Sequence, residues 1–176
     1  MGKSSLIRRY VQSMFDDSYL MTIGVKVSKK VVEVSLPSDP VPITLELSIW
    51  DVMGQPQFRE LLQEAYFTGV AGIIAVADLT RKETVQALYE WIDRVDRVTS
   101  QAPVVIAGNK ADLKDRVKVD PADISKLANA FHAESLMTSA KTGSNVEEAF
   151  RILSTRIVER ALKNRPSMGL ASTKPA

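Results

Sequence analysis

Three consecutive residues near the start of the chain, Gly2, Lys3 and Ser4, match the end of a phosphate-binding loop, which reads G-x-x-x-x-G-K-[ST]. Only Met1 precedes them, so the first half of that motif is missing. An amphipathic segment follows, and a helix N-terminus offers free N–H groups and a partial positive charge to a phosphate. Lys3 would then reach the β- and γ-phosphates of a nucleotide, and the Ser4 hydroxyl would bind Mg²⁺. For this tripeptide taken alone, an ordinary helix cap is the alternative.

A second group of such residues closes an alternating strand pattern, in the stretch "IWDVMGQ". Asp51 would hold Mg²⁺ through water at the end of that strand. Gly54 would allow the backbone to approach a terminal phosphate closely, because glycine has no Cβ. Gln55 would orient a water molecule. The alternative is a strand that ends in an ordinary polar turn.

The stretch "VVIAGNKADL" places Asn109, Lys110 and Asp112 directly after an apolar strand. A carboxylate such as that of Asp112 accepts two hydrogen bonds from the ring N–H and the exocyclic amine of guanine, whereas adenine offers no matching pair of donors. A later stretch, "MTSAKTG", would put a backbone N–H and an aliphatic lysine stem beside the base. Its residues are Ser139, Ala140 and Lys141. For that stretch a small polar turn is the alternative.

These four stretches fall where an α/β fold would bring them together. Three apolar runs, "AGIIAVADL", "APVVIAGNK" and "AESLMTSAK", alternate with amphipathic segments whose apolar residues recur every three or four positions. That alternation predicts a parallel sheet with helices on both faces. Ligands bind beyond the carboxyl ends of the strands in such a sheet, where these polar residues stand. Pro121 is expected in the first turn of a helix, where its missing N–H costs nothing.

An antiparallel hairpin is expected before the parallel strands. "VKVSKKVVEVSL" and "ITLELSIW" alternate as half-buried strands do, and "PSDPVP" between them is typical of a turn. From residue 164 onwards, "NRPSMGLASTKPA" is rich in proline, serine, glycine and alanine, which predicts disorder. The chain is therefore expected to form one domain over residues 1–162, followed by a disordered tail over residues 163–176.

Composition narrows the classes of function. The formal charge of +2 comes from 23 basic and 21 acidic residues without a long basic run, so no nucleic-acid partner is expected. The 176 residues include no cysteine, which excludes disulfides, thiolate metal sites and a lipid anchor on cysteine. The apolar stretch "VAGIIAVA" is too short to span a bilayer, and no signal-peptide pattern opens the chain. A cytoplasmic protein, at most peripheral to membranes, is the expectation.

In order and spacing, the four motifs resemble those of the Ras-like small GTPases, and those of the Rab branch most closely, from residue 1 to about residue 162. "IWDVMGQPQFREL" is similar to the Rab form "WDTAGQERFR". Thr22 follows Ser4 at the family spacing between the P-loop hydroxyl and the switch I threonine. Phe15 stands where the family places an aromatic ring against guanine. The resemblance implies a P-loop G-domain, with a mostly parallel sheet, one antiparallel hairpin strand and helices on both faces.

The resemblance also implies ligands and residue roles. The ligand would be GTP or GDP, and the cofactor Mg²⁺. The phosphates would be bound by Gly2, Lys3, Ser4, Ser5, Thr22 and Gly54. Guanine would be bound by Phe15, Asn109, Lys110, Asp112, Ser139, Ala140 and Lys141. The Mg²⁺ ligands would be Ser4, Thr22 and Asp51. Catalysis would rest on Gln55, which positions the attacking water, and on Lys3, which neutralises phosphate charge.

The implied function is that of a molecular switch that hydrolyses GTP to GDP and phosphate and binds effectors when loaded with GTP. Residues from about 16 to 24 and from 52 to 66 would be its switch segments. Tyr19 stands where Gα proteins carry an arginine, so hydrolysis would be slow without a GTPase-activating protein. Exchange factors are the other implied partners. Because no C-terminal cysteine encodes a prenyl anchor, membrane association would need a partner.

Several departures from the family pattern leave alternatives open. The opening strand and the front of the P-loop are absent, which would expose strand edges in the middle of the sheet, so an N-terminally incomplete G-domain is expected. Val52 and Met53 replace the usual threonine and alanine, and Pro56 follows Gln55. A pseudo-GTPase, or a truncated interaction module without effective nucleotide binding, is the alternative function. An ATP-dependent P-loop enzyme fits less well, because "NKAD" would then serve no base.

Overall fold

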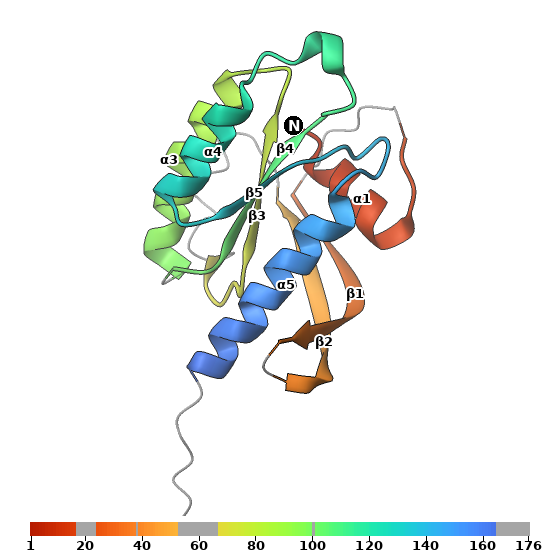
Figure 1. The fold of residues 1–176 in the computed structure, drawn as a ribbon, viewed down its shortest axis with the longest axis vertical. Coiled ribbons are helices and arrows are strands. Elements are labelled where there is room, and N and C mark those ends of the chain that lie inside the picture. The colour runs from red at the N-terminus through yellow and green to blue at the C-terminus, as the bar shows by residue number, and fades with distance from the viewer. Residues whose placement is uncertain (17–23, 38, 53–66, 100, 165–176) are drawn as a thin grey trace, which may run out of the picture.

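The computed structural model describes residues 1–16, 24–37, 39–52, 67–99 and 101–164. Its elements, in chain order, are α1 (Lys3–Gln12), β1 (Val25–Leu36), β2 (Asp39–Val52), β3 (Ile73–Asp78), α3 (Glu83–Thr99), β4 (Val104–Asn109), the 3₁₀ turn η2 (Lys114–Arg116), α4 (Pro121–Ala130), β5 (Glu134–Met137) and α5 (Val146–Lys163). Figure 1 shows their arrangement. The mixed α/β fold predicted from the sequence is confirmed, with its hairpin, its parallel strands and the helices between them.

The described strands form two sheets. β1 and β2 pair antiparallel, with Val25 opposite Val52. β3, β4 and β5 pair in parallel in that spatial order, with Ile73 opposite Val104. Among the described strands no ladder of hydrogen bonds joins β2 to β3. The two sheets are therefore held together by side chains.

Helices cover both faces of the parallel sheet, α3 and α4 on one side and α5 on the other (Figure 1). The alternation of side chains along β4 separates the two cores. Ile106 packs with Ile92 of α3 and Ile124 of α4, whereas its neighbour Ala107 packs with Phe150 of α5. Burial on both faces explains why the parallel strands read as nearly continuous apolar runs.

Helix α1 bridges the two sheets. Its Leu6 and Tyr10 are buried with Val76 of β3, and Leu47 of β2 packs against the same cluster. The rings of Tyr10 and Phe150 stack with their centroids 3.7 Å apart, so α1 is also joined to α5. Because α1 packs against both sheets, its first turn is fixed relative to the strands on either side.

The hairpin turn is tighter than the sequence predicted. The stretch "PSDPVP" was expected to lie outside the strands, but β2 begins at Asp39 and includes Pro40 and Pro42. The register shifts between Val34 and Leu36 of the partner strand, opposite these prolines. Proline is tolerated there because a bulge interrupts the ladder, so the missing N–H breaks no regular pairing.

The ends of the last two helices match their local sequence. Pro121 occupies the first turn of α4, as predicted, and the Asp120 carboxylate caps the helix by accepting a hydrogen bond from the Ala122 N–H at 2.8 Å. α5 continues to Lys163, one residue past the expected domain boundary. The expected tail from residue 165 onwards lies outside the described residues. No helix in the described ranges combines the length and apolar character that a membrane crossing requires.

Candidate functional site

The start of the chain lies beside the carboxyl end of β4 (Figure 1), where Asn109 is the last residue of the strand and only 1% exposed. The Asn109 Nδ2 donates a hydrogen bond to the Met1 carbonyl at 3.1 Å. The Asn109 Oδ1 accepts one from the Ala140 N–H at 3.1 Å. One side chain thereby joins the beginning of the first predicted motif to the last one, which lies far away in the sequence.

Gly2 fits this contact because it has no side chain. Its φ of 89° is in the left-handed region, and a Cβ on it would lie 2.5 Å from the Asn109 Nδ2. Gly2 also caps α1 through its carbonyl, which accepts from the Leu6 N–H at 2.9 Å. The first turn of α1, which carries Lys3 and Ser4, holds no acidic residue to compensate the positive end of the helix dipole. These features suit the approach of a phosphate.

The predicted guanine-binding residues are linked to each other by a second hydrogen bond. The Ser139 hydroxyl, which is buried, donates to the Asp112 Oδ1 at 2.6 Å. The same hydroxyl accepts from the Thr142 N–H at 3.1 Å. In the described part of the chain, no residue bonds the second carboxylate oxygen of Asp112. One oxygen of that carboxylate is thus anchored to the stretch that follows β5.

Lys110, which lies between Asn109 and Asp112 in the sequence, forms an ion pair that the sequence analysis did not anticipate. Its backbone adopts a φ of 71°, which is uncommon for a non-glycine residue, and its Nζ lies 2.8 Å from the Asp78 Oδ2. Lys110 was predicted to contact guanine. Its ammonium is committed to a carboxylate in this structure, so the predicted contact with guanine would fall to its aliphatic stem.

Asp78, at the end of β3, is a component of the site that the sequence analysis missed. It is fully buried, and its carboxylate accepts hydrogen bonds from Arg81 at 3.2 Å and from the Thr80 hydroxyl at 2.6 Å, in addition to the Lys110 contact. Burial alone would raise the pKa of the Asp78 carboxyl, but the hydrogen bonds from Lys110 and Thr80 lower the pKa to about 2. The carboxylate therefore stays charged at neutral pH and holds the loop after β4.

The Met1 amino group lies 4.0 Å from the Asp78 Oδ2. Burial lowers its pKa to about 6, against the opposing attraction of the carboxylate. The contact adds a second connection between the start of the chain and the carboxyl ends of the parallel strands.

Asp51, the predicted Mg²⁺ ligand on β2, is 5% exposed. Alternation along the strand places it on the same face as Leu47 and Ile49, which pack against the cluster that contains Leu6 of α1. The described residues hold no group of three or more histidine, cysteine or carboxylate side chains that could bind a metal ion. A Mg²⁺ ion here would rely on hydroxyl, phosphate and water oxygens beside one carboxylate, which is a donor set that Mg²⁺ accepts.

Of the other predicted site residues, some lie within the described ranges and some lie outside them. Phe15 is half-buried, and its ring centroid lies 6.0 Å from the guanidinium carbon of Arg9. The Lys141 side chain is exposed, while its carbonyl accepts a hydrogen bond from Arg9. The predictions that lie outside the described residues are those for Thr22, Gly54 and Gln55, together with the departures at Met53 and Pro56.

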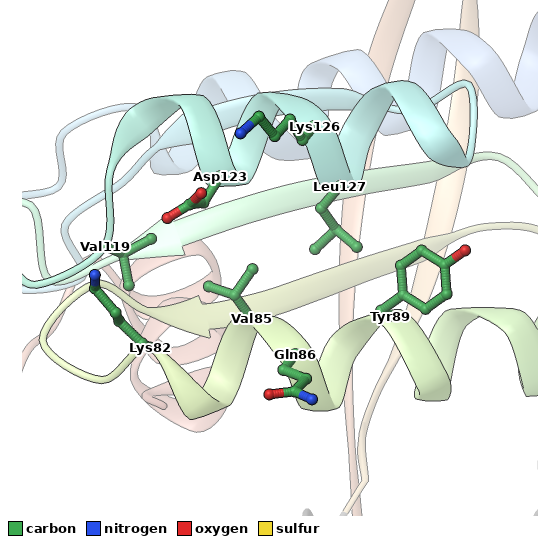
Figure 2. A pocket seen from close by; sticks show the side chains of 8 residues that line it. All are labelled: Lys82, Val85, Gln86, Tyr89, Val119, Asp123, Lys126 and Leu127. Atoms are coloured by element: carbon green, nitrogen blue, oxygen red, sulfur yellow. The ribbon is translucent and has the colours of Figure 1, made fainter.

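A shallow cavity of about 390 Å³ opens between α3 and α4 (Figure 2). Val85, Tyr89 and Leu127 supply much of its apolar lining, and Lys82 and Lys126 also contribute to its wall. None of its lining residues belongs to the predicted nucleotide site. The candidate site is therefore defined by the contacts around Asn109, Asp112 and Asp78, and the cavity is separate from it.

Comparison with known proteins decides the family. Residues 1–159 match the sequence model of the Ras family. The chain belongs to the Ras family. It is 32% identical to the Ras-related protein Rab-1A of Dictyostelium discoideum over 174 residues, which covers 98% of this chain and 83% of that relative. It is 33% identical to the GTP-binding protein ypt4 of Schizosaccharomyces pombe over 161 residues, which covers 90% of this chain and 68% of that relative.

Ras-family proteins are GTP-binding switches that hydrolyse GTP, and the two relatives agree with the resemblance to the Rab branch. In this Ras-family chain the described parts of three motifs, at the start of α1, after β4 and after β5, meet around Asn109. The fourth motif is described only as far as Val52, and Asp51 lies on the hairpin face that packs against α1. Arg9, which no motif contains, contacts the stretch after β5 as well.

Proposed function

We propose that this Ras-family protein binds GDP and GTP at the edge formed by the start of α1, the end of β4 and residues 139–141. The proposal rests on the position of Asn109. Its amide bonds to the Met1 carbonyl on one side and to the Ala140 N–H on the other. A nucleotide that lay along this edge would have its phosphates at the helix start and its base at residues 139–141.

In the proposed complex, Asp112 selects guanine. Its free oxygen would accept hydrogen bonds from the base, while the other oxygen is held by Ser139 and needs no rearrangement. The backbone of Ala140, whose N–H is held by Asn109, and the Lys141 stem would lie along the edge and face of the ring. Discrimination against adenine would be large, because adenine leaves the carboxylate without its donors.

The phosphates would lie at the first turn of α1. The Lys3 ammonium and the N–H groups of Ser4 and Ser5 would neutralise their charge. Ser4, Asp51 and Thr22 would hold Mg²⁺, which when bound lowers the charge on the phosphate oxygens. Gly54 would approach the terminal phosphate.

We propose further that GTP hydrolysis turns effector binding off. Gln55 would orient the attacking water, and the rate would be slow unless an activating protein supplies an arginine. Exchange factors would replace GDP with GTP. Membrane association would come through partner proteins, and residues 1–162 would act as the G-domain.

A titration with fluorescent GDP in the presence of Mg²⁺ tests the proposal. Saturable binding that is weakened by a Mg²⁺ chelator and competed by GTP, but not by the same concentration of ATP, is the expected result. Equal competition by ATP would indicate an ATP-binding protein instead. Absence of saturable binding would support an interaction module that uses no nucleotide.

A further inference from the structure

Arg9 connects the helix that faces the proposed phosphates to the stretch that faces the proposed base. It lies in the last turn of α1, whose first turn carries Lys3. Its Nε donates a hydrogen bond to the Ala140 carbonyl at 2.8 Å, and its Nη2 donates to the Lys141 carbonyl at 2.6 Å. Arg9 is 131 and 132 positions away from its two partners in the sequence, so no local structure accounts for these two bonds.

The guanidinium is fixed on its own side as well. Its Nη1 donates to the Ser13 carbonyl at 3.1 Å, and the ring of Phe15 lies against it with its centroid 6.0 Å away. A planar guanidinium presents several N–H donors in a rigid fork, and so it holds two successive carbonyls at once. A lysine ammonium is a compact group on a flexible stem and does not reproduce this geometry.

The peptide groups of Ala140 are therefore held from two directions. Its N–H bonds to Asn109, on the side of β4, and its carbonyl bonds to Arg9, on the side of α1. The neighbouring Ser139 is held by its side chain, whose hydroxyl donates to the Asp112 carboxylate. Without Arg9, the carbonyls of Ala140 and Lys141 would lose charge-assisted hydrogen bonds, which are among the stronger ones in proteins.

We propose that Arg9 is a positioning residue for guanine binding. It would act without touching base or phosphate, by fixing residues 139–141 against α1, so that base and phosphates are held in one rigid site. This inference rests on the proposed nucleotide binding. It predicts that Arg9 controls how long a bound nucleotide stays, although it lies outside the four recognised motifs.

Arg9→Ala tests the inference, with Arg8→Ala as the matched control. Arg8 lies on the same helix, pairs with Asp16 at 3.6 Å and makes no described bond to residues 139–141, so its loss removes the same charge without removing a bond to that stretch. Fluorescent GDP is bound to each protein and chased with excess unlabelled GDP. Dissociation from Arg9→Ala is expected to be about tenfold faster than from the wild type, and dissociation from Arg8→Ala to stay within about twofold. The rate for Arg9→Lys is expected to fall between those of the two alanine variants, because the ammonium keeps the charge but cannot reach both carbonyls as the planar fork does.

Amide hydrogen exchange separates positioning from a general loss of structure. In Arg9→Ala, exchange should become faster in residues 139–143 while the amides of α5 keep their wild-type protection. Equal loss of protection in α5, or dissociation at the wild-type rate, would overturn the inference and leave the proposed function standing. Wild-type protein that takes up no fluorescent GDP would overturn both.

Discussion

The hydroxyl of Ser139 donates a 2.6 Å hydrogen bond to the carboxylate of Asp112, across 27 positions of sequence. Ser139 is buried two residues after the end of β5, and Asp112 follows the neighbouring strand, β4. The bond fixes the orientation of the carboxylate before any ligand arrives. Preorganisation of this kind removes an ordering cost from binding.

Replacing the carboxylate of Asp112, which only accepts hydrogen bonds, with an amide, which both donates and accepts, should change the base that the protein prefers. In Asp112→Asn, the amide oxygen can still accept the Ser139 bond, but the amide nitrogen would face the donors of guanine. We expect the affinity for GDP to fall about a hundredfold, and the preference for xanthosine diphosphate to rise, because xanthine carries a carbonyl in place of the exocyclic amine. Competition against fluorescent GDP measures both.

Asp115→Asn is the control for that experiment. Asp115 is exposed in η2, close in sequence to Asp112, and makes no contact with residues 139–141 among the described bonds. It should leave the nucleotide preference unchanged. Unaltered GDP affinity in Asp112→Asn would contradict the assignment of Asp112 to the base.

The contact between Gly2 and Asn109 can be tested by adding one carbon atom. Gly2→Ala places a Cβ 2.5 Å from the Asn109 Nδ2, whereas a Cβ on Gly69, where φ is 79°, meets no described atom within 4 Å. Both variants strain a left-handed backbone at a cost of about 1 kcal/mol. Gly2→Ala alone must also displace Asn109. We expect it to lower both the free energy of unfolding in urea and the affinity for GDP more than Gly69→Ala does; equal effects would argue against the contact.

Asp78 makes stability depend on acid pH. Its pKa is lowered to about 2 in the folded protein, so the unfolded chain binds its proton at a higher pH than the folded chain does. The stabilisation is complete above pH 4 and is lost as the pH falls through 2, and it amounts to about 2 kcal/mol. In Asp78→Asn the protein should be less stable at pH 7, and this part of the pH dependence should vanish from urea unfolding curves.

Asp93→Asn is the control for the effect of Asp78→Asn on the pH dependence of stability. Asp93 forms a half-exposed pair with Arg97 at 2.7 Å on α3, and surface pairs of this kind contribute little. Its loss should leave the acid dependence of stability close to that of the wild type. An acid profile in Asp78→Asn that still falls as steeply as the wild type would show that another group is responsible.

Hydrolysis can be separated from binding at Gln55, which lies outside the described residues. Gln55→Leu cannot orient water, so the rate of single-turnover GTP hydrolysis should fall about tenfold while the affinity for GDP stays unchanged. Phosphate release measured after GTP loading checks this. A hydrolysis rate equal to that of the wild type would remove Gln55 from the proposed mechanism.

The positions of the helices and strands, and of the polar residues that follow the strands, could be predicted from the sequence because both depend on local patterns. The run "VVIAGN" is apolar because β4 is buried on both faces, and ligand-binding residues follow such strands in α/β sheets. Asn109 and Asp112 could be selected on that basis. The family matched by residues 1–159 agrees with the resemblance that these motifs carried.

What the sequence could not show are contacts between distant segments. Arg9 is one basic residue in an amphipathic helix, and nothing local indicates that its partners are 131 and 132 positions away. Asp78 ends an apolar run as many strand residues do, and only the fold reveals its burial beside Lys110. The prolines of β2 were read as a turn because the bulge that admits them depends on the partner strand.

A crystal structure of the protein grown with GDP and Mg²⁺ would test the central claim most directly. The proposal requires the guanine ring between Asp112 and residues 139–141, and the diphosphate at the first turn of α1 beside Lys3. Crystals without nucleotide at millimolar GDP, or with GDP bound elsewhere on the molecule, would contradict it.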